Sequence, residues 1–180
     1  LKEYPVEVIP NGINLDVFRP GEKLTAGTES PFTGPVGDSV SVREKTYTVL
    51  GVANRWEERK GLVHFEKLAE TLPENYRIKL VGVDRRQAKM LRRKYRNGKI
   101  LPICRTANVG ELVQLYREAD VYVNATLEDN FPTTNLESLA CGTPVITFAT
   151  GGSAESLSDA CGVVIPKGDD AALAEKVLFK

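Results

Sequence analysis

The chain has 180 residues, of which 42% are hydrophobic and 27% charged, and its 24 basic side chains balance its 24 acidic ones. This composition is that of an ordinary globular domain, and it excludes a disordered tail, a collagen-like fibre and a disulfide miniprotein. Because the formal net charge is zero, the chain has no general attraction to nucleic acid, and no nucleic-acid partner is expected.

Short apolar runs recur along the chain and are separated by amphipathic helical patterns. The predicted strands are 6–9, 47–52, 78–81, 100–104, 121–125, 145–148 and 163–165. Most of these runs are continuously apolar, which is typical of strands covered on both faces. The alternation of strands and helices predicts an α/β domain with a Rossmann-like open parallel sheet and helices on both faces.

Residues 21–46 differ from the rest of the chain. They are rich in Gly, Ser, Thr and Pro and show no periodicity, so we predict a mobile surface loop. The folded core is expected over 47–180. Since the sequence starts at Leu1 and ends within a helical pattern, we interpret it as part of a longer protein.

Ligands of open parallel sheets bind at the carboxyl ends of the strands, so residues that follow the apolar runs are candidate site residues. Arg55 follows the strand 47–52, and Lys60 lies five residues further on, at the expected start of the next helix. A lysine at a helix N-terminus is electrostatically unfavourable unless an anion binds there, and this pair suits a diphosphate. In the alternative interpretation, both are solvated charges that Glu57 and Glu58 neutralise.

A second cluster follows the predicted strand 121–125. Thr133 or Thr134 suits the N-cap of the next helix, and Glu137, one turn into it, can accept two hydrogen bonds from vicinal hydroxyls. In the alternative interpretation, Thr134 and Glu137 form a capping box without any ligand. The glycines at 151–152, after the strand 145–148, either admit a ligand or make a tight turn, and the turn is the preferred interpretation.

Several short motifs occur along the chain in the same order as in a known protein family. They are Val8-Ile9-Pro10-Asn11-Gly12, Asp16-Val17-Phe18-Arg19-Pro20, Arg55 with Lys60-Gly61, Leu136-Glu137-Ser138-Leu139-Ala140-Cys141-Gly142-Thr143-Pro144, and Gly151-Gly152 with Glu155. Together they resemble the C-terminal, nucleotide-sugar-binding domain of a retaining GT-B glycosyltransferase of the large group-1 (GT4) family. The resemblance covers nearly the whole chain and implies one half of a GT-B fold, with 1–20 as interdomain segment and first strand and without the N-terminal acceptor domain.

The resemblance also implies roles for individual residues. The family's diphosphate-binding basic pair falls on Arg55 and Lys60, and the ribose-binding second glutamate of its E-x7-E motif falls on Glu137. The first acid of that motif falls on Asp129, where glutamate is usual. Pro132 replaces the usual glycine and has no N–H to offer a ligand. The remaining expected donor-binding residues are Arg105, near the base, and Thr133 and Thr134.

The implied reaction is transfer of a sugar from a nucleoside diphosphate sugar to an acceptor hydroxyl, with retention of configuration. The sequence has no Asp-x-Asp motif and no metal-ligand spacing, so neither a metal nor another cofactor is expected. The acceptor, a carbohydrate or a lipid-linked molecule, would bind the missing domain. The alternatives are another GT-B enzyme, such as a nucleotide-sugar epimerase or a phosphorylase, and a non-catalytic nucleotide-sugar-binding or interaction module.

The location of the protein follows from three observations. The apolar runs, such as 144–149, are too short to span a membrane, and no basic-then-apolar leader opens the chain. The three cysteines, Cys104, Cys141 and Cys161, lie in apolar runs, which predicts buried, reduced thiols in a cytoplasmic protein. The basic segment 85–99 is either a peripheral contact with an anionic membrane or a solvated helix face. His64, the single histidine, is expected at the surface.

Overall fold

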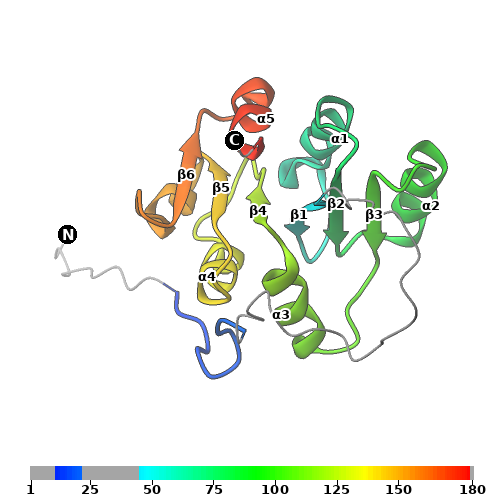
Figure 1. Cartoon of the computed structure of the whole chain (residues 1–180). Helices are drawn as coiled ribbons and strands as arrows, with labels where there is room; N and C mark the ends of the chain where they lie inside the picture. Colours follow the sequence, from blue (N-terminus) through cyan, green and yellow to red (C-terminus); the bar gives the residue numbers. More distant parts are fainter. Residues whose placement is uncertain (1–10, 22–44, 179–180) are drawn as a thin grey trace, which may run out of the picture.

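The computed structural model describes residues 11–21 and 45–178 and shows an open six-stranded sheet flanked by helices (Figure 1). The strands are β1 (Tyr47–Val52), β2 (Tyr76–Val81), β3 (Ile100–Ile103), β4 (Val121–Asn124), β5 (Val145–Phe148) and β6 (Gly162–Ile165). The helices are η1 (Glu58–Lys60), α1 (Leu62–Thr71), α2 (Arg85–Lys94), α3 (Val109–Glu118), α4 (Thr133–Ala140), η2 (Gly151–Ser156) and α5 (Asp170–Val177), where η1 and η2 are 3₁₀ helices.

The strand order is β3-β2-β1-β4-β5-β6, and every neighbouring pair is parallel. This is the Rossmann order, in which the chain reverses direction across the sheet between β1 and β4. The predicted α/β fold class is therefore confirmed. Six of the seven predicted strands are found within two residues of their expected bounds. The predicted strand 6–9 and residues 22–44 of the predicted loop 21–46 lie outside the described residues.

Each face of the sheet packs against its own set of helices. Val49 and Ile78 belong to a core that includes side chains of α1, α2 and α5. Leu50 and Tyr122, on neighbouring strands, point to the opposite face and pack with side chains of α3 and α4. Since successive strand residues alternate between faces and both faces are covered, the continuous apolar runs of the sequence are explained.

Two sequence-based expectations about single residues are wrong. The imidazole of His64 is buried: it packs edge-on against Phe148, and its Nδ1 lies 2.5 Å from a carboxylate oxygen of Asp170. The helix α5 covers this position, which the spacing within α1 alone could not show. Of the three cysteines predicted to be buried, only Cys141 is: Cys104 is exposed, because it follows the last residue of β3 at the open edge of the sheet, and Cys161 is partly exposed.

Candidate functional site

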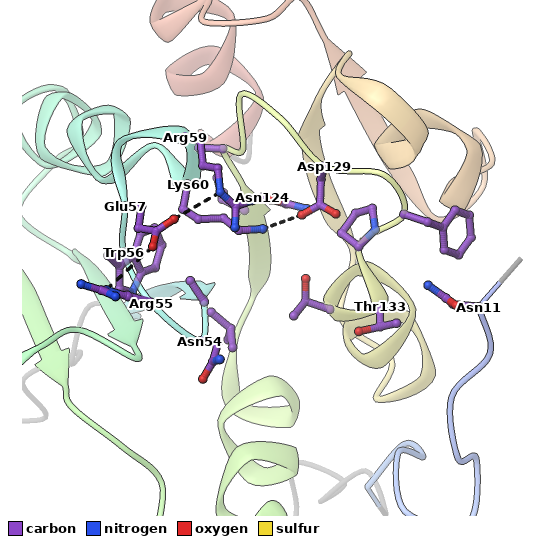
Figure 2. A pocket seen from close by; sticks show the side chains of 17 residues that line it. Asn11, Asn54, Arg55, Trp56, Glu57, Arg59, Lys60, Asn124, Asp129 and Thr133 are labelled. Atoms are coloured by element: carbon purple, nitrogen blue, oxygen red, sulfur yellow. Dashed lines mark hydrogen bonds and ion pairs between the residues drawn. The ribbon is translucent and has the colours of Figure 1, made fainter.

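A cavity of about 560 Å³ opens where β1 and β4 end side by side (Figure 2). Its walls come from the segments that follow β1, from the end of β4, from the start of α4 and from Asn11. The lining residues on which the site depends are Asn54, Arg55, Trp56, Lys60, Asn124, Asp129, Thr133 and Thr134. The cavity therefore lies at the point where the strand order reverses, which is the usual ligand position in such sheets.

Lys60 reaches across the cavity to Asp129, as Figure 2 shows, and its Nζ lies 2.5 Å from Oδ2 of that residue. The two side chains are only 24% and 18% exposed. Of the two interpretations of Lys60, the solvated charge neutralised by Glu57 or Glu58 is wrong, because Asp129 is its ion-pair partner. Lys60 is also the last residue of η1 and precedes the N-cap of α1, so it does not lie in the first turn of that helix.

The turn that carries Lys60 is fixed against the loop after β4. The carbonyl of Arg59 accepts a hydrogen bond of 2.7 Å from the N–H of Leu127, and the Thr126 hydroxyl lies 3.2 Å from the same oxygen. Gly61 has a left-handed φ of 73°, and a Cβ there would lie 2.0 Å from the carbonyl oxygen of Ala125. Only glycine permits this close approach, which sets the distance between Lys60 and Asp129.

Arg55 lies in the same segment after β1 as Lys60, with 81% of its side chain exposed, and its Nε lies 3.8 Å from a carboxylate oxygen of Glu57. Its backbone is held by its neighbour: the indole N–H of Trp56 donates to the carbonyl of Val81, and Gln87 donates to the carbonyl of Trp56. Arg55 is thus a solvated charge close to Glu57, as the alternative interpretation proposed, whereas Lys60 is not. Arg55 nevertheless lines the cavity.

Helix α4 begins at the cavity without a side-chain cap. Its N-cap is Pro132, so Thr133 and Thr134 are the first two helical residues, and the expectation that one of them is the cap is wrong. The capping box of Thr134 and Glu137 is wrong for the same reason, since neither occupies the required position. A helix N-terminus with no side-chain cap presents backbone N–H groups to an anion in the cavity.

Glu137 lies one turn into α4 and faces α3 rather than the cavity wall. Its Oε2 accepts a hydrogen bond of 3.0 Å from the hydroxyl of Tyr116, which is almost completely buried. Burial raises the pKa of the Glu137 carboxyl, although the hydrogen bonds from Tyr116 and Thr133 oppose the shift. Burial and this carboxylate also raise the pKa of Tyr116, so the phenol stays protonated and donates.

The structure thus brings five of the seven predicted site residues to one cavity: Arg55, Lys60, Asp129, Thr133 and Thr134. Glu137 lies on the same helix but does not line the cavity. Arg105 is exposed in the loop after β3 and does not line it either. Two strands of the sheet, β2 and β1, separate β3 from β4, which explains why this loop is remote.

Several residues of the site had no signal in the sequence analysis. Asn124 is buried at the end of β4, and its amide donates to Asn135 of α4, whose own amide donates to Ser156 of η2. This chain of amides joins β4, α4 and η2. Gly151 and Gly152, for which a tight turn is the preferred interpretation of the sequence, begin the 3₁₀ helix η2 and pack closely on the loop after β4: a Cβ on Gly151 would lie 1.9 Å from the carbonyl oxygen of Asp129, and one on Gly152 would lie 1.9 Å from that of Asn130. Within the described residues, no group of three or more potential metal ligands occurs.

The fold and the cavity define a class of protein: a Rossmann-like domain with a cavity at its strand-reversal point that is lined by basic side chains and a helix N-terminus. Comparison with known proteins narrows this class. Residues 38–179 match the family described as glycosyl transferases group 1. The chain belongs to this family.

Individual relatives agree with the family. The chain is 26% identical over 178 residues to a D-inositol 3-phosphate glycosyltransferase of Geodermatophilus obscurus, which covers 92% of this chain and 37% of the relative. It is 27% identical over 173 residues to the enzyme of that name from Mycobacteroides abscessus. The matched region covers 89% of this chain and 35% of that relative. The chain thus spans little more than a third of the curated relatives it matches.

Solved structures show the same fold. A sucrose-phosphate synthase from Thermosynechococcus elongatus superposes with a TM-score of 0.69 at 25% identity, covering 94% of this chain and 41% of that one. The C-terminal domain of a glycosyl transferase group 1 family protein from Francisella tularensis superposes with a TM-score of 0.68 at 21% identity, covering 92% and 86%. The described fold is therefore the Rossmann-like half found in GT-B glycosyltransferases.

Proposed function

We propose that the chain is the donor-binding domain of a retaining glycosyltransferase, which moves a sugar from a nucleoside diphosphate sugar to an acceptor hydroxyl. The observation that carries the proposal is the cavity itself: in a group-1 family fold, Lys60, Arg55 and the start of α4 converge on one space of about 560 Å³. Such a space is large enough for part of a nucleotide sugar and is lined by groups that favour an anion.

The chemical demand of the reaction is the negative charge that develops on the leaving diphosphate. Lys60 would supply a point charge, Arg55 a planar fork, and the N–H groups of Thr133 and Thr134 a positive helix end. These groups would supply the positive charge within the cavity, so the proposal includes no metal and no other cofactor. Asp129, which lines the same cavity, would lie near the sugar end of the donor.

The nucleoside would bind beside α4. Glu137 would receive the ribose hydroxyls, which requires its carboxylate to exchange the Tyr116 hydroxyl for a ligand hydroxyl. We keep Arg105 as a residue near the base, and its exposed position means that a ligand would have to extend along the strand ends toward β3. The acceptor, a carbohydrate or a lipid-linked molecule, would be held by a separate acceptor domain.

We further propose that the basic segment 85–99 makes a peripheral contact with an anionic membrane, which would place a cytoplasmic enzyme close to a lipid-linked acceptor. The apolar stripe of α2, with Ala88 and Leu91, packs inward, so the cations of α2 and the half-exposed Met90 face outward. Lys99, at the end of the segment, is buried instead and donates to the carbonyls of Leu72 and Pro73. Within the described residues, no helix is long and apolar enough to cross a bilayer. Co-sedimentation with phosphatidylserine vesicles, but not with phosphatidylcholine vesicles, would support this contact.

A calorimetric titration of the chain with UDP, GDP and ADP, and with their sugars, tests the proposed function. We expect one of the three nucleoside diphosphates to bind, and to bind more tightly than its own nucleoside. Binding of the nucleoside and the diphosphate with equal affinity would contradict the assigned anion site, and binding of none of the three would contradict the proposed function.

A further inference from the structure

The ion pair of Lys60 and Asp129 crosses the cavity that the donor would enter. Both residues line the cavity, and the pair is largely shielded from solvent. In Figure 2 the Asp129 carboxylate lies at the end of the Lys60 side chain, where an incoming phosphate would have to meet the ammonium group. The carboxylate of Asp129 is therefore already paired with Lys60, the less exposed of the two basic side chains proposed to bind the diphosphate.

The backbone on both sides of this ion pair is fixed by contacts with neighbouring loops, whereas the two side chains are held to each other by the pair itself. The turn before α1 is anchored at Arg59 and Gly61. The carbonyl of Asp129 accepts a hydrogen bond of 3.2 Å from the N–H of Gly152, and Gly151 packs directly against it. A ligand could thus displace the Asp129 side chain by rotation about its χ1 without moving the loop.

A diphosphate and the Asp129 carboxylate cannot both bind Lys60 at low energetic cost. Each is an anion, and like charges a few ångströms apart in a partly buried site repel strongly. A ligand gains the ammonium group only by displacing the carboxylate, so part of its interaction with Lys60 is offset. The cost of breaking the ion pair is the same for every ligand, whereas the attraction between the ligand and Lys60 grows with the charge of the ligand, so a ligand with little charge has less attraction to offset it.

We propose that Asp129 is a positioning and selectivity residue, a resident anion that holds Lys60 extended across the empty cavity and that the donor diphosphate must displace. The inference rests on the proposed function and deepens it. It predicts that Asp129 lowers the affinity for diphosphate instead of contributing to it. It also predicts that removing the charge of Asp129 raises the affinity for any anion that binds Lys60.

The test is the affinity of Asp129→Asn for inorganic pyrophosphate, and for UDP, GDP and ADP, measured by calorimetry. The variant keeps the size of the side chain and removes its charge. We expect pyrophosphate to bind at least about fivefold more tightly than to the unchanged chain, because one opposing charge has been removed beside the phosphate. Pyrophosphate, which carries more negative charge, should gain at least as large a factor as inorganic phosphate.

Two matched variants complete the experiment. Glu128→Gln removes the same charge one residue earlier from an exposed side chain that does not line the main cavity, and its affinity should stay within about twofold of the unchanged chain. Asp129→Glu restores the charge and should bring the affinity back toward the unchanged value. A thermal melt of each variant accounts for any loss of folded protein.

The outcomes distinguish the inference from the proposed function. If the unchanged chain binds these anions and Asp129→Asn binds them equally or more weakly, the displacement of Asp129 is refuted while the donor site stands. If neither the unchanged chain nor Asp129→Asn binds pyrophosphate or any of the three nucleoside diphosphates, both the inference and the proposed function are overturned. Equal gains in Asp129→Asn and Glu128→Gln would also overturn the inference, because the effect would then be a general one of charge.

Discussion

Two basic regions of the molecule differ in almost every physical property. At the cavity, Lys60 is one part-buried ammonium with one carboxylate partner, on a turn fixed to the neighbouring loop. On α2, six of ten residues are cationic and exposed: Arg85, Arg86, Lys89, Arg92, Arg93 and Lys94. Of these six, only Lys94 has a carboxylate partner within the part of the chain that the structure describes.

The comparison indicates that the burial and backbone support of a charged side chain, and not the number of charges in a region, identify a ligand site. A cation that is shielded from water and held by a fixed backbone interacts strongly with an anion, whereas scattered exposed cations are screened by salt. The α2 cations also repel one another along the helix, and a broad anionic surface could neutralise them together. The two regions therefore predict different responses to single substitutions.

The largest effect is expected at the turn that carries Lys60. Gly61→Ala places a Cβ 2.0 Å from the Ala125 carbonyl oxygen on a residue with φ of 73°. We expect the free energy of unfolding to fall by at least about 3 kcal/mol in chemical denaturation, because both backbone strain and a steric clash arise.

Gly98 provides a matched control, since it has the same φ of 73° but no atom within 4 Å of its would-be Cβ. Gly98→Ala should cost only about 1 kcal/mol, the strain of the left-handed conformation alone. Equal losses at the two glycines would show that the approach to Ala125 does not fix the turn.

The next effect is on ligand affinity at α4. Glu137→Gln should weaken binding of the nucleoside diphosphate by about 1.5–3 kcal/mol if the carboxylate receives the ribose hydroxyls. The nucleoside should lose about the same amount, because it contains the same ribose. Unchanged calorimetric affinities for both ligands would remove Glu137 from the site.

The same variant has a pH-dependent effect on stability. Burial raises the pKa of Glu137 in the folded chain above its ordinary value of 4.5, so the folded state holds this proton more tightly than the unfolded state does. The stability of the unchanged chain, relative to Glu137→Gln, should therefore fall as the pH rises from about 4.5 through the raised folded pKa. Denaturation curves at several pH values measure this difference, and a rise with pH would contradict the burial argument.

A smaller effect is expected from Lys60→Ala on the empty chain. A lysine at a helix N-terminus would be unfavourable and its removal harmless, but Lys60 precedes that helix and pairs with Asp129. Removing it leaves a shielded carboxylate without its partner. We expect a loss of about 1–2 kcal/mol in the free energy of unfolding. A gain in melting temperature would show that the pair is not formed in solution.

The smallest effect is expected on α2. The double substitution Lys89→Ala and Arg93→Ala removes two exposed cations that lie one turn apart. The free energy of unfolding should change by no more than about 0.5 kcal/mol, and the affinity for a nucleoside diphosphate should not change. A clear loss of that affinity would break the distinction between the two regions.

The sequence predicted the fold well because the fold depends on a repeated signal. Each strand within the described residues coincides with an apolar run of the sequence, and the reversal of strand order at β1 and β4 follows the usual topology of such sheets. The basic side chains of Arg55 and Lys60 and the hydroxyls of Thr133 and Thr134 were predicted near the ends of these two strands for the same reason. Once the strands are recognised, the residues that follow them can be read directly from the sequence.

The contacts within the site depend on the fold and could not be predicted. That Lys60 pairs with Asp129 results from the docking of two loops 69 residues apart. That Glu137 bonds Tyr116 results from the packing of α4 on α3, and a three-residue spacing suggested a capping box instead. His64 is buried because α5 folds back over α1, and no local pattern in α1 records this.

The central claim is that Lys60, and not positive charge in general, gives the cavity its affinity for a diphosphate. The most direct test compares how strongly a nucleoside diphosphate is preferred over its nucleoside in the unchanged chain, in Lys60→Ala and in Lys89→Ala, by calorimetry at one salt concentration. We predict that the preference is largely lost in Lys60→Ala, with the nucleoside affinity nearly unchanged, and that it is retained in Lys89→Ala. Retention of the preference in Lys60→Ala, or an equal loss in both variants, would contradict the claim.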